Sequence, residues 1–245
     1  MKIAISGILG KMGQVLVQSI QKDPTLTLVG GIDQVASNNV FTSFDELSES
    51  DVLIDFSHAS QLSRLLAYAV QVNLPLVIAT TGYTADQLRT IQEASKKIPI
   101  FFSANYSFGV SVIVQLLQQI SPLLYADFDV EIIDKHHNQK VDAPSGTALL
   151  LANTIKKAST SSKTIQNGRN GKRQLGEIAI HSIRAGTIVG EHSIVFAGQD
   201  EVIEINHIAQ SKSIFAYGAL KASKYIVNQK PGLYGMDQLV RDTNA

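Results

Sequence analysis

The amino-acid sequence predicts an α/β fold, with a Rossmann-like doubly wound parallel sheet followed by a second α+β domain that has a mixed or antiparallel sheet. In the first hundred residues, short apolar runs typical of buried strands alternate with stretches of helical periodicity. A glycine-rich turn directly follows the first of these runs. After about residue 105, a long apolar helix and several strand-like runs take over. Strands that alternate with helices form βαβ units, which build parallel sheets.

The elements expected in the first half are short and closely spaced. We expect strands at residues 3–6, 26–33, 52–56, 75–80 and 100–103, and helices at 12–22, 60–72 and 84–97. The run at 52–56 is continuous rather than alternating, as in a strand buried on both faces. Thr84 and Gln87 form a Thr-x-x-Gln capping box, which predicts the start of the third helix.

The second half predicts a different arrangement. Helices are expected at 108–124, 145–157 and 213–228, and strands at 127–136, 177–184, 188–196 and 201–209. Short turns between the last three strands predict an antiparallel meander. Residues 159–174 are polar and predict a surface loop, and 232–245 predict a short tail. We expect the last helix to return to the first domain, which gives one domain of residues 1–106 with 214–245 and another of residues 107–213.

Composition and charge exclude several classes of function. Twenty-one Lys and Arg residues balance 21 Asp and Glu residues, which argues against a globally basic nucleic-acid binder. The sequence has no cysteine, and this excludes a disulfide framework, a thiolate metal site and a Cys nucleophile. No apolar run approaches the ~18 residues that span a bilayer. The first residues predict a strand entering a turn rather than a signal peptide. We therefore expect a cytoplasmic protein without a nucleic-acid or membrane partner.

A glycine turn indicates a dinucleotide site. Gly7, Gly10 and Gly13 follow the first expected strand and open the first expected helix, a variant of the dinucleotide fingerprint. The helix N-terminus offers N–H groups to phosphates. Asp33 lies twenty residues after Gly13, where a carboxylate can accept from ribose hydroxyls. Asp33 favours NADH because a carboxylate repels a 2′-phosphate, but Lys11 in the turn could offset this repulsion, so NADPH stays open. A flavin is the less favoured ligand.

A second cluster of reactive residues follows the strand expected at 127–136. His136, His137 and Lys140 precede an expected helix N-terminus at Gly146 and Thr147. This combination fits a small carboxylated substrate, with charge neutralisation by the ammonium and the helix end and proton transfer by a histidine. Taken alone, the His pair could be surface residues and the Gly-Thr pair an ordinary helix start. We expect no metal site, because the spacing of the other histidines is not a metal motif. Those histidines are His181, His192 and His207.

Five motifs occur in order along the chain. They are Gly-Ile-Leu-Gly-Lys-Met-Gly at 7–13, Ala-Thr-Thr-Gly-Tyr at 79–83, Asn-Tyr-Ser-Phe-Gly at 105–109, Glu-x-x-x-x-His-His-x-x-Lys-x-Asp-Ala-Pro-Ser-Gly-Thr-Ala at 131–148, and Arg-Ala-Gly-x-x-Val-Gly-Glu-His at 184–192. Along nearly its whole length the chain resembles the 4-hydroxy-tetrahydrodipicolinate reductase family, also called dihydrodipicolinate reductases. The run at 131–148 is the most specific of these motifs.

The resemblance implies reduction of a cyclic imine dicarboxylate on the diaminopimelate route to lysine, with NADH or NADPH as hydride donor. It implies that His136 is the acid–base group, that Lys140 is the proton donor, and that His137, Gly146 and Thr147 hold the substrate carboxylates. The implied cofactor-binding residues are Gly7, Ile8, Leu9, Gly10, Lys11, Met12, Asp33, Ala79, Thr80, Thr81, Ser103, Ala104, Asn105 and Tyr106. The family also implies a homotetramer assembled through the sheet of the second domain, and closure of the two domains on binding.

Three positions depart from the family pattern. Lys11 stands where the family usually has Arg, Ala79 replaces a glycine, and Gln34 rather than a basic residue follows Asp33. The first and third departures put a preference for NADPH in doubt. Two alternatives stay open at this point. One is another NAD-dependent two-domain reductase of a carboxylated imine or carbonyl. The other is a non-catalytic NAD(H) sensor, which would need a DNA-binding helix pair or a basic stripe that the sequence does not show.

Overall fold

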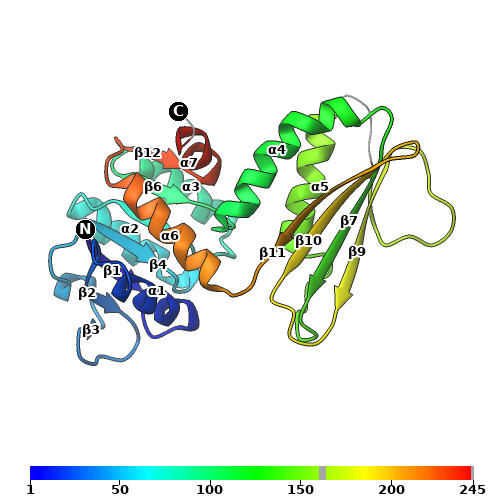
Figure 1. The fold of residues 1–245 in the computed structure, drawn as a ribbon. Helices are drawn as coiled ribbons and strands as arrows, with labels where there is room; N and C mark the ends of the chain where they lie inside the picture. Colours follow the sequence, from blue (N-terminus) through cyan, green and yellow to red (C-terminus); the bar gives the residue numbers. More distant parts are fainter. Residues whose placement is uncertain (160–163, 244–245) are drawn as a thin grey trace. The chain divides into compact units, whose positions relative to one another are not determined.

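The computed structural model describes residues 1–159 and 164–243, and parts of the expected loop at 159–174 and of the tail at 232–245 lie outside these residues. The chain divides into two compact units (Figure 1). The first comprises Met1–Phe108 together with Lys212–Ala245, and the second comprises Gly109–Ser211. Among the helices of the described residues, none is both long enough and apolar enough to cross a membrane.

The first unit contains a parallel sheet with the strand order β12-β6-β5-β4-β1-β2-β3. Its strands are β1 (Lys2–Ser6), β2 (Thr27–Ile32), β3 (Val40–Phe41), β4 (Val52–Asp55), β5 (Leu76–Ile78), β6 (Pro99–Phe102) and β12 (Gly232–Tyr234). Its α-helices are α1 (Lys11–Gln21), α2 (Leu62–Gln71), α3 (Ala85–Ser95), α6 (Ser213–Ile226) and α7 (Met236–Thr243). Strand β2 pairs with one side of β1 and β4 with the other, so a topological switch point lies at β1, where α/β sheets bind ligands.

Helices cover both faces of this sheet, as a doubly wound fold requires (Figure 1). Ile3 and Ile5 of β1 face the core shared with α1, α6 and α7, whereas Ala4 faces the core shared with α2 and α3. All three side chains are fully buried, which explains the continuous apolar strands read from the sequence. Thr84 and Gln87 form the expected capping box at the start of α3.

The second unit is a five-stranded mixed sheet with α4 (Phe108–Leu124) and α5 (Gly146–Ala158) on one face (Figure 1). Its strands are β7 (Asp129–His136), β8 (Thr164–Asn167), β9 (Glu177–Arg184), β10 (Glu191–Ala197) and β11 (Val202–Ile208), in the spatial order β11-β10-β7-β9-β8. Val130 and Ile132 of the central strand β7 point into the core beneath the helices, together with Ile194 and Phe196 of β10. The predicted fold class, a Rossmann-like sheet followed by an α+β unit, is confirmed.

The predicted antiparallel meander of three consecutive strands is wrong. Strand β7 lies between β9 and β10, parallel to β9 and antiparallel to β10, and only β10 and β11 form a hairpin. The short turn at 185–187 brings the chain past the end of β7, where Ala185 N–H donates to the His136 carbonyl. Short turns show that strands are near one another but not which strands pair. Strand β7, whose Val130 and Ile132 face the core, takes the central position.

Four further strands and α-helices of the described residues were not expected from the sequence. Strand β8 lies within the polar segment predicted as a loop, where Ile165 packs on the core and the strand pairs with β9 at the sheet edge. The predicted tail contains β12 and α7, which bury Leu239 and Val240. Strand β3 has two residues and pairs with β2. These elements are short, and backbone pairing at a sheet edge leaves little hydrophobic pattern to detect.

Gly13→Ala tests the close approach of α1 to the turn before it. A Cβ at Gly13 would lie 2.2 Å from the Gly7 carbonyl oxygen, which is a main-chain atom that cannot move away easily. We expect this overpacked variant to lose about 1–3 kcal/mol of stability, measured by denaturant unfolding. Gly10→Ala is the matched control, because its Cβ would lie 3.2 Å from the same oxygen. Equal loss of stability in the two variants would contradict this reading.

Candidate active site

The glycine turn in the first unit has the geometry that a dinucleotide requires. Gly7 has a φ of 79°, and a Cβ there would lie 2.6 Å from the Phe56 carbonyl oxygen. No side chain caps the N-terminus of α1, which leaves its first N–H groups directed toward the turn. The Asp33 carboxylate, just after β2, accepts from the N–H of Leu9 at 2.8 Å and from that of Gln34 at 2.8 Å. The acid predicted from sequence spacing therefore lies directly against the turn.

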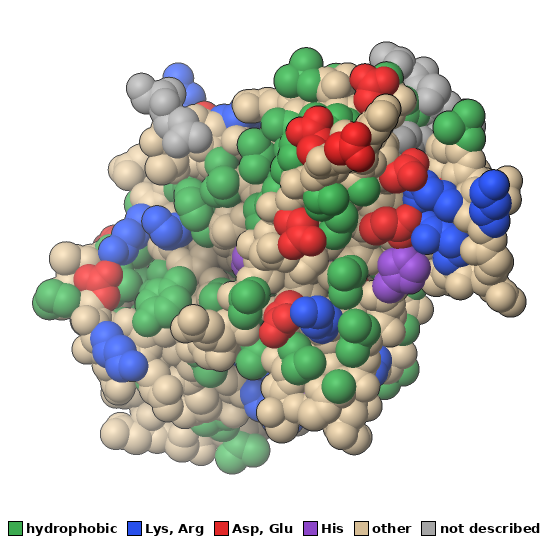
Figure 2. Space-filling view, turned by 45° about the vertical axis from the view of Figure 1, so that its right-hand side comes forward, with side chains coloured by type: hydrophobic (Ala, Val, Ile, Leu, Met, Phe, Trp, Pro, Cys, Tyr) green, Lys and Arg blue, Asp and Glu red, His purple; other side chains and the backbone are tan. Residues whose placement is uncertain are grey.

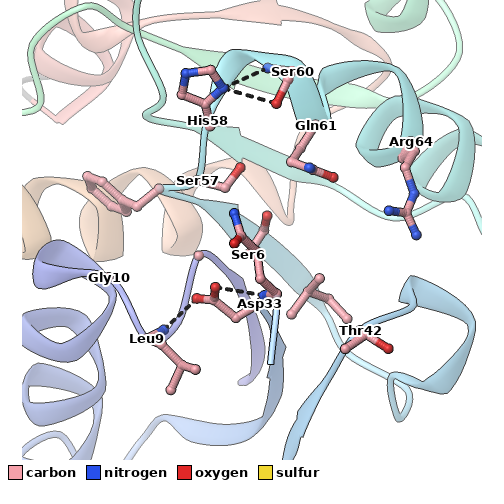
Figure 3. A pocket seen from close by; sticks show the side chains of 14 residues that line it. Ser6, Leu9, Gly10, Asp33, Thr42, Ser57, His58, Ser60, Gln61 and Arg64 are labelled. Carbon is pink, nitrogen blue, oxygen red and sulfur yellow. Dashed lines mark hydrogen bonds between the residues drawn. The ribbon is translucent and has the colours of Figure 1, made fainter. Parts of the chain in front are cut away.

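A cavity of about 900 Å³ opens beside this turn (Figure 3). Its lining includes Gly7, Leu9, Gly10, Asp33, Gln34 and Arg64. In Figure 3, Arg64 extends from α2 toward Thr42, at the other end of the pocket from Gly10. Arg64 has no ion-pair partner within the part of the chain that the structure describes. A mixed polar and apolar lining, with a carboxylate near the turn and a cation across from it, fits a nucleotide with its ribose at Asp33.

The other expected cofactor residues lie in the same unit, but they differ in burial and in local contacts. Ile8 is buried beneath the turn, whereas Lys11 is exposed at the start of α1. Tyr106 is buried and its hydroxyl donates to the carbonyl of Ile78 at 2.8 Å, so its side chain holds the strand ends together rather than facing the cavity. Ala79, Thr80 and Thr81 follow β5, and Ser103, Ala104 and Asn105 follow β6, at the carboxyl edge of the parallel sheet. Met12 packs on the core from α1.

In the second unit, His136 ends β7 beside a buried carboxylate. Nδ1 of His136 lies 2.9 Å from Oδ1 of Asp134, and Nε2 of His192 lies 3.5 Å from the same oxygen. The two imidazole rings are 5.3 Å apart in a T-shaped arrangement. A Cβ at Gly190 would lie 3.0 Å from Nε2 of His136, so this glycine leaves room beside the ring. The arrangement places one imidazole at the surface and a second behind it.

The charge state of this cluster follows from burial and from neighbouring charges. Burial lowers the pKa of His136 below its usual value; the Asp134 carboxylate opposes this effect, while Lys140 and Arg184 add to it. Burial lowers the pKa of His192 to about 4. Burial disfavours ionisation of Asp134, but hydrogen bonds from Ser145 and Arg184 outweigh it and hold the pKa of Asp134 below its usual value. The cluster of Asp134, His136 and His192 therefore contains one anion and two imidazoles that are neutral at pH 7.

Lys140 and the N-terminus of α5 complete the site. The Lys140 ammonium lies 2.6 Å from the Asp142 carboxylate, which lowers the pKa of Asp142. Ser145 caps α5 by accepting from the N–H of Ala148 at 3.1 Å, and its hydroxyl also lies 3.0 Å from Nε2 of His192. Apart from the adjoining residues and the backbone of α5 itself, no described atom lies within 4 Å of where a Cβ of Gly146 would be, so a ligand can approach this helix end closely. A cation beside an open helix N-terminus is suited to carboxylates.

The residues expected to bind and protonate the substrate lie on one segment of the second unit. His136, Lys140 and Gly146 lie between the end of β7 and the start of α5, and Lys140 is near enough to His136 to affect its pKa. His137 directly follows the strand, and its carbonyl accepts from the N–H of Lys140 at 3.1 Å. Thr147 lies in the first turn of α5.

Asp134, Arg184 and His192 have no assigned role in the sequence analysis. The sequence pattern could have singled out Asp134. It follows Val130 and Ile132 on the core-facing side of β7, where charged residues are rare. One ligand atom from each of Asp134, His136 and His192 lies within 4.8 Å of the others, a spacing compatible with a metal ion. The same carboxylate, however, already pairs with Arg184, and this cation opposes a second one.

Fold and candidate site together are those of a two-unit oxidoreductase, with a Rossmann-like fold in the first unit and a group of imidazoles, a lysine and an open helix N-terminus in the second. Residues 1–106 match the family model for the N-terminus of dihydrodipicolinate reductase, and residues 109–240 match the model for its C-terminus. The chain belongs to the dihydrodipicolinate reductase family, a family of pyridine-nucleotide-dependent reductases. The resemblance inferred from the motifs is confirmed.

Individual relatives cover the whole chain. It is 47% identical to 4-hydroxy-tetrahydrodipicolinate reductase of Clostridium novyi (strain NT), over 99% of each chain. It is 48% identical to the protein of the same name from Clostridium tetani (strain Massachusetts / E88), over 96% of this chain and 95% of the relative. Among solved structures, it is similar to dipicolinate-bound dihydrodipicolinate reductase from Paenisporosarcina sp. TG-14, with a TM-score of 0.82, 28% identity and coverage of 97% and 98% of the two chains.

Acidification tests the burial of His192. In the unfolded chain a histidine takes up a proton near pH 6.5, whereas folded His192 resists protonation down to about pH 4. The unfolded state therefore binds more protons in this window, and the free energy of unfolding of the second unit falls as the pH drops from about 6.5 to about 4. We expect His192→Asn to flatten this fall, measured by denaturant unfolding across the window. His58→Asn, at an exposed position, is the control. An unchanged pH dependence in His192→Asn would contradict the assignment.

Proposed function

We propose that this chain reduces 4-hydroxy-tetrahydrodipicolinate to tetrahydrodipicolinate on the diaminopimelate route to lysine. The observation that carries the proposal is the grouping of His136, Lys140 and the open N-terminus of α5 on one segment of the second unit. A ring with two carboxylates matches this set, because the helix end and the ammonium attract anions while the imidazole handles a proton. An NAD(H) sensor would have no use for such a group.

The overall reaction adds one hydride and one proton to the ring and releases one water. The pyridine nucleotide, when bound in the first unit, supplies the hydride. Lys140 is proposed as the proton donor and His136 as the acid–base group that accompanies it. His137, Gly146 and Thr147 are proposed to hold the substrate carboxylates. Lys140 is paired with Asp142 in this structure, so a substrate carboxylate would compete with Asp142 for the ammonium.

Both NADH and NADPH fit the charges of the first unit. Asp33 is proposed to accept from the ribose hydroxyls, and it favours NADH. Arg64 lines the same cavity and supplies the positive charge that the sequence lacks directly after Asp33. A guanidinium can pair with a 2′-phosphate through two parallel hydrogen bonds. The proposed cofactor specificity is therefore dual, with the balance set by these two residues.

His136→Gln and Lys140→Ala test the proposed roles. We expect each to lower kcat by roughly 100-fold or more, the usual contribution of a general acid or base, with the Kd for NADH unchanged. Lys140→Ala should also raise the KM for the ring substrate. Lys135→Ala is the control, because this neighbouring lysine pairs with Glu191 on β10 rather than with the site residues. Near-normal turnover in His136→Gln would refute its role, and normal values for Lys140→Ala would refute the other.

Asp33→Asn and Arg64→Gln should change cofactor preference in opposite directions. Asn retains an acceptor for the Leu9 N–H but loses the charge that repels a 2′-phosphate, so the ratio of kcat/KM for NADPH to that for NADH should rise. Arg64→Gln removes the cation, and this ratio should fall. Each change should be about tenfold, as expected for a hydrogen bond to a charged group. Steady-state kinetics with both cofactors measure this ratio. A ratio that stays unchanged in both variants would contradict the proposal.

We further propose a homotetramer assembled through the face of the five-stranded sheet that α4 and α5 leave uncovered. Val202 and Ile208 of the edge strand β11 are 59% and 63% exposed, and Ile183 of β9 is 44% exposed. Figure 2 shows hydrophobic side chains scattered among acidic and basic ones on the side of the protein facing the viewer. Exposed apolar side chains on a sheet face with charged neighbours are suited to association between copies of a chain.

Val202→Lys combined with Ile208→Lys should disrupt this assembly. Burying two ammonium groups in an interface is unfavourable, so light scattering after size exclusion should show a mass below that of the tetramer. Val72→Lys, which alters an apolar side chain that is 48% exposed in the first unit, is the control and should leave the mass unchanged. A tetramer that persists in the double variant would contradict assembly through this face.

A further inference from the structure

Asp134 is a fully buried carboxylate in a strand that is otherwise apolar on that side. It follows Val130 and Ile132 on the core-facing side of β7. Burying a carboxylate costs free energy unless hydrogen bonds and opposite charges compensate for it. The identity of its partners therefore indicates why this position carries a charge.

The two oxygens of Asp134 have different partners. Oδ2 accepts from the Ser145 N–H at 2.8 Å, from Arg184 Nη2 at 2.9 Å and from the Ser182 hydroxyl at 3.2 Å. Oδ1 faces the imidazoles of His136 and His192. The short contact between Oδ1 and Nδ1 of His136 lacks the angles of a directed hydrogen bond, so the carboxylate acts on this ring mainly through its charge.

We propose that Asp134 is a positioning residue for the reaction, because its one buried charge acts on the His136 imidazole and also fixes the N-terminus of α5. The proposal rests on the role of His136 proposed above and adds a residue that touches neither substrate nor cofactor. Through Oδ1, Asp134 stabilises the protonated form of His136. Through Oδ2, it holds Ser145, which caps the helix whose end is proposed to receive the substrate carboxylates.

The charges around His136 come from every element packed near it. The charged groups are Asp134 on β7, Lys140 and Asp142 on the following segment, and Arg184 on β9; the titratable neighbours are His192 on β10 and, behind it, His207 on β11. Asp134 raises the pKa of His136, whereas Lys140 and Arg184 lower it. Removing the Asp134 carboxylate would leave the two cations acting on the ring and lower the pKa of His136. Removing Arg184 would take away one of these cations and raise it. The two removals therefore have opposite expected effects on one measurable quantity.

The test is the titration of His136 by NMR in the full-length protein, together with the pH profile of kcat. In Asp134→Asn, the pKa of His136 should fall by about one pH unit, the effect expected for loss of an adjacent opposite charge, and kcat should fall about tenfold or more. In Arg184→Gln, the pKa of His136 should rise. If Asp134 and Arg184 had only structural roles, the two variants would not shift the pKa of His136 in opposite directions.

The chain offers a matched control three residues away. Glu131, also on β7, pairs with Arg169, Arg173 and His181, but its side chain alternates to the other face of the sheet. Glu131→Gln should leave the titration of His136 unchanged. Asp134→Glu keeps the charge and should restore part of the pKa and of kcat.

An unchanged His136 pKa in Asp134→Asn would overturn the proposal. If Asp134→Asn does not fold, the titration of His136 in Arg184→Gln is the test. A pKa of His136 that does not rise in this variant would overturn the proposal. Failure of the proposed function gives a different result: the wild-type protein would not turn over the ring substrate, while the NMR titrations of His136 would still report on Asp134.

Discussion

The buried carboxylate of Asp134 is the interaction on which the second unit depends. It lies at the point where the apolar side of β7 becomes the site, and it connects β7 to β9 through Arg184 and to α5 through Ser145. A hydrophobic residue there would continue the core but leave the Arg184 guanidinium without its carboxylate partner and the Ser145 N–H without its acceptor. The geometry of the site is therefore a consequence of one charge that the core must enclose and compensate.

The first unit depends on a different constraint, because main-chain atoms approach one another closely around its glycine turn. Gly7 adopts a positive φ, and Gly13 lies where a Cβ would collide with the Gly7 carbonyl. Gly31 of β2 faces Ile8 of the turn in the same way, since a Cβ there would lie 2.5 Å from the Ile8 side chain. These contacts, together with the bond from Leu9 to Asp33, hold the turn against the ends of β1 and β2.

Sequence reasoning predicted the elements with strong periodicity and the motifs with fixed spacing. The glycine turn and the segment from His136 to Thr147 depend on neighbours close in sequence, and such neighbours leave a readable pattern. Asp33 lies farther along the chain but at a characteristic spacing from the turn. The position of β7 between β9 and β10 and the cation of Arg64 depend on packing between distant segments. No local pattern encodes them. Asp134 is predictable only in part. The sequence places its charge at a core position, but it does not show that Arg184 and His192 lie beside it.

The most direct measurement of the central claim is cofactor oxidation with the ring substrate generated in place from pyruvate and aspartate semialdehyde by its synthase. The assay is run in parallel with NADH and NADPH. We expect rapid oxidation of both cofactors, and this oxidation should require the synthase. If neither cofactor is oxidised although both bind, the nucleotide site stands and the assignment of the dicarboxylate substrate is contradicted.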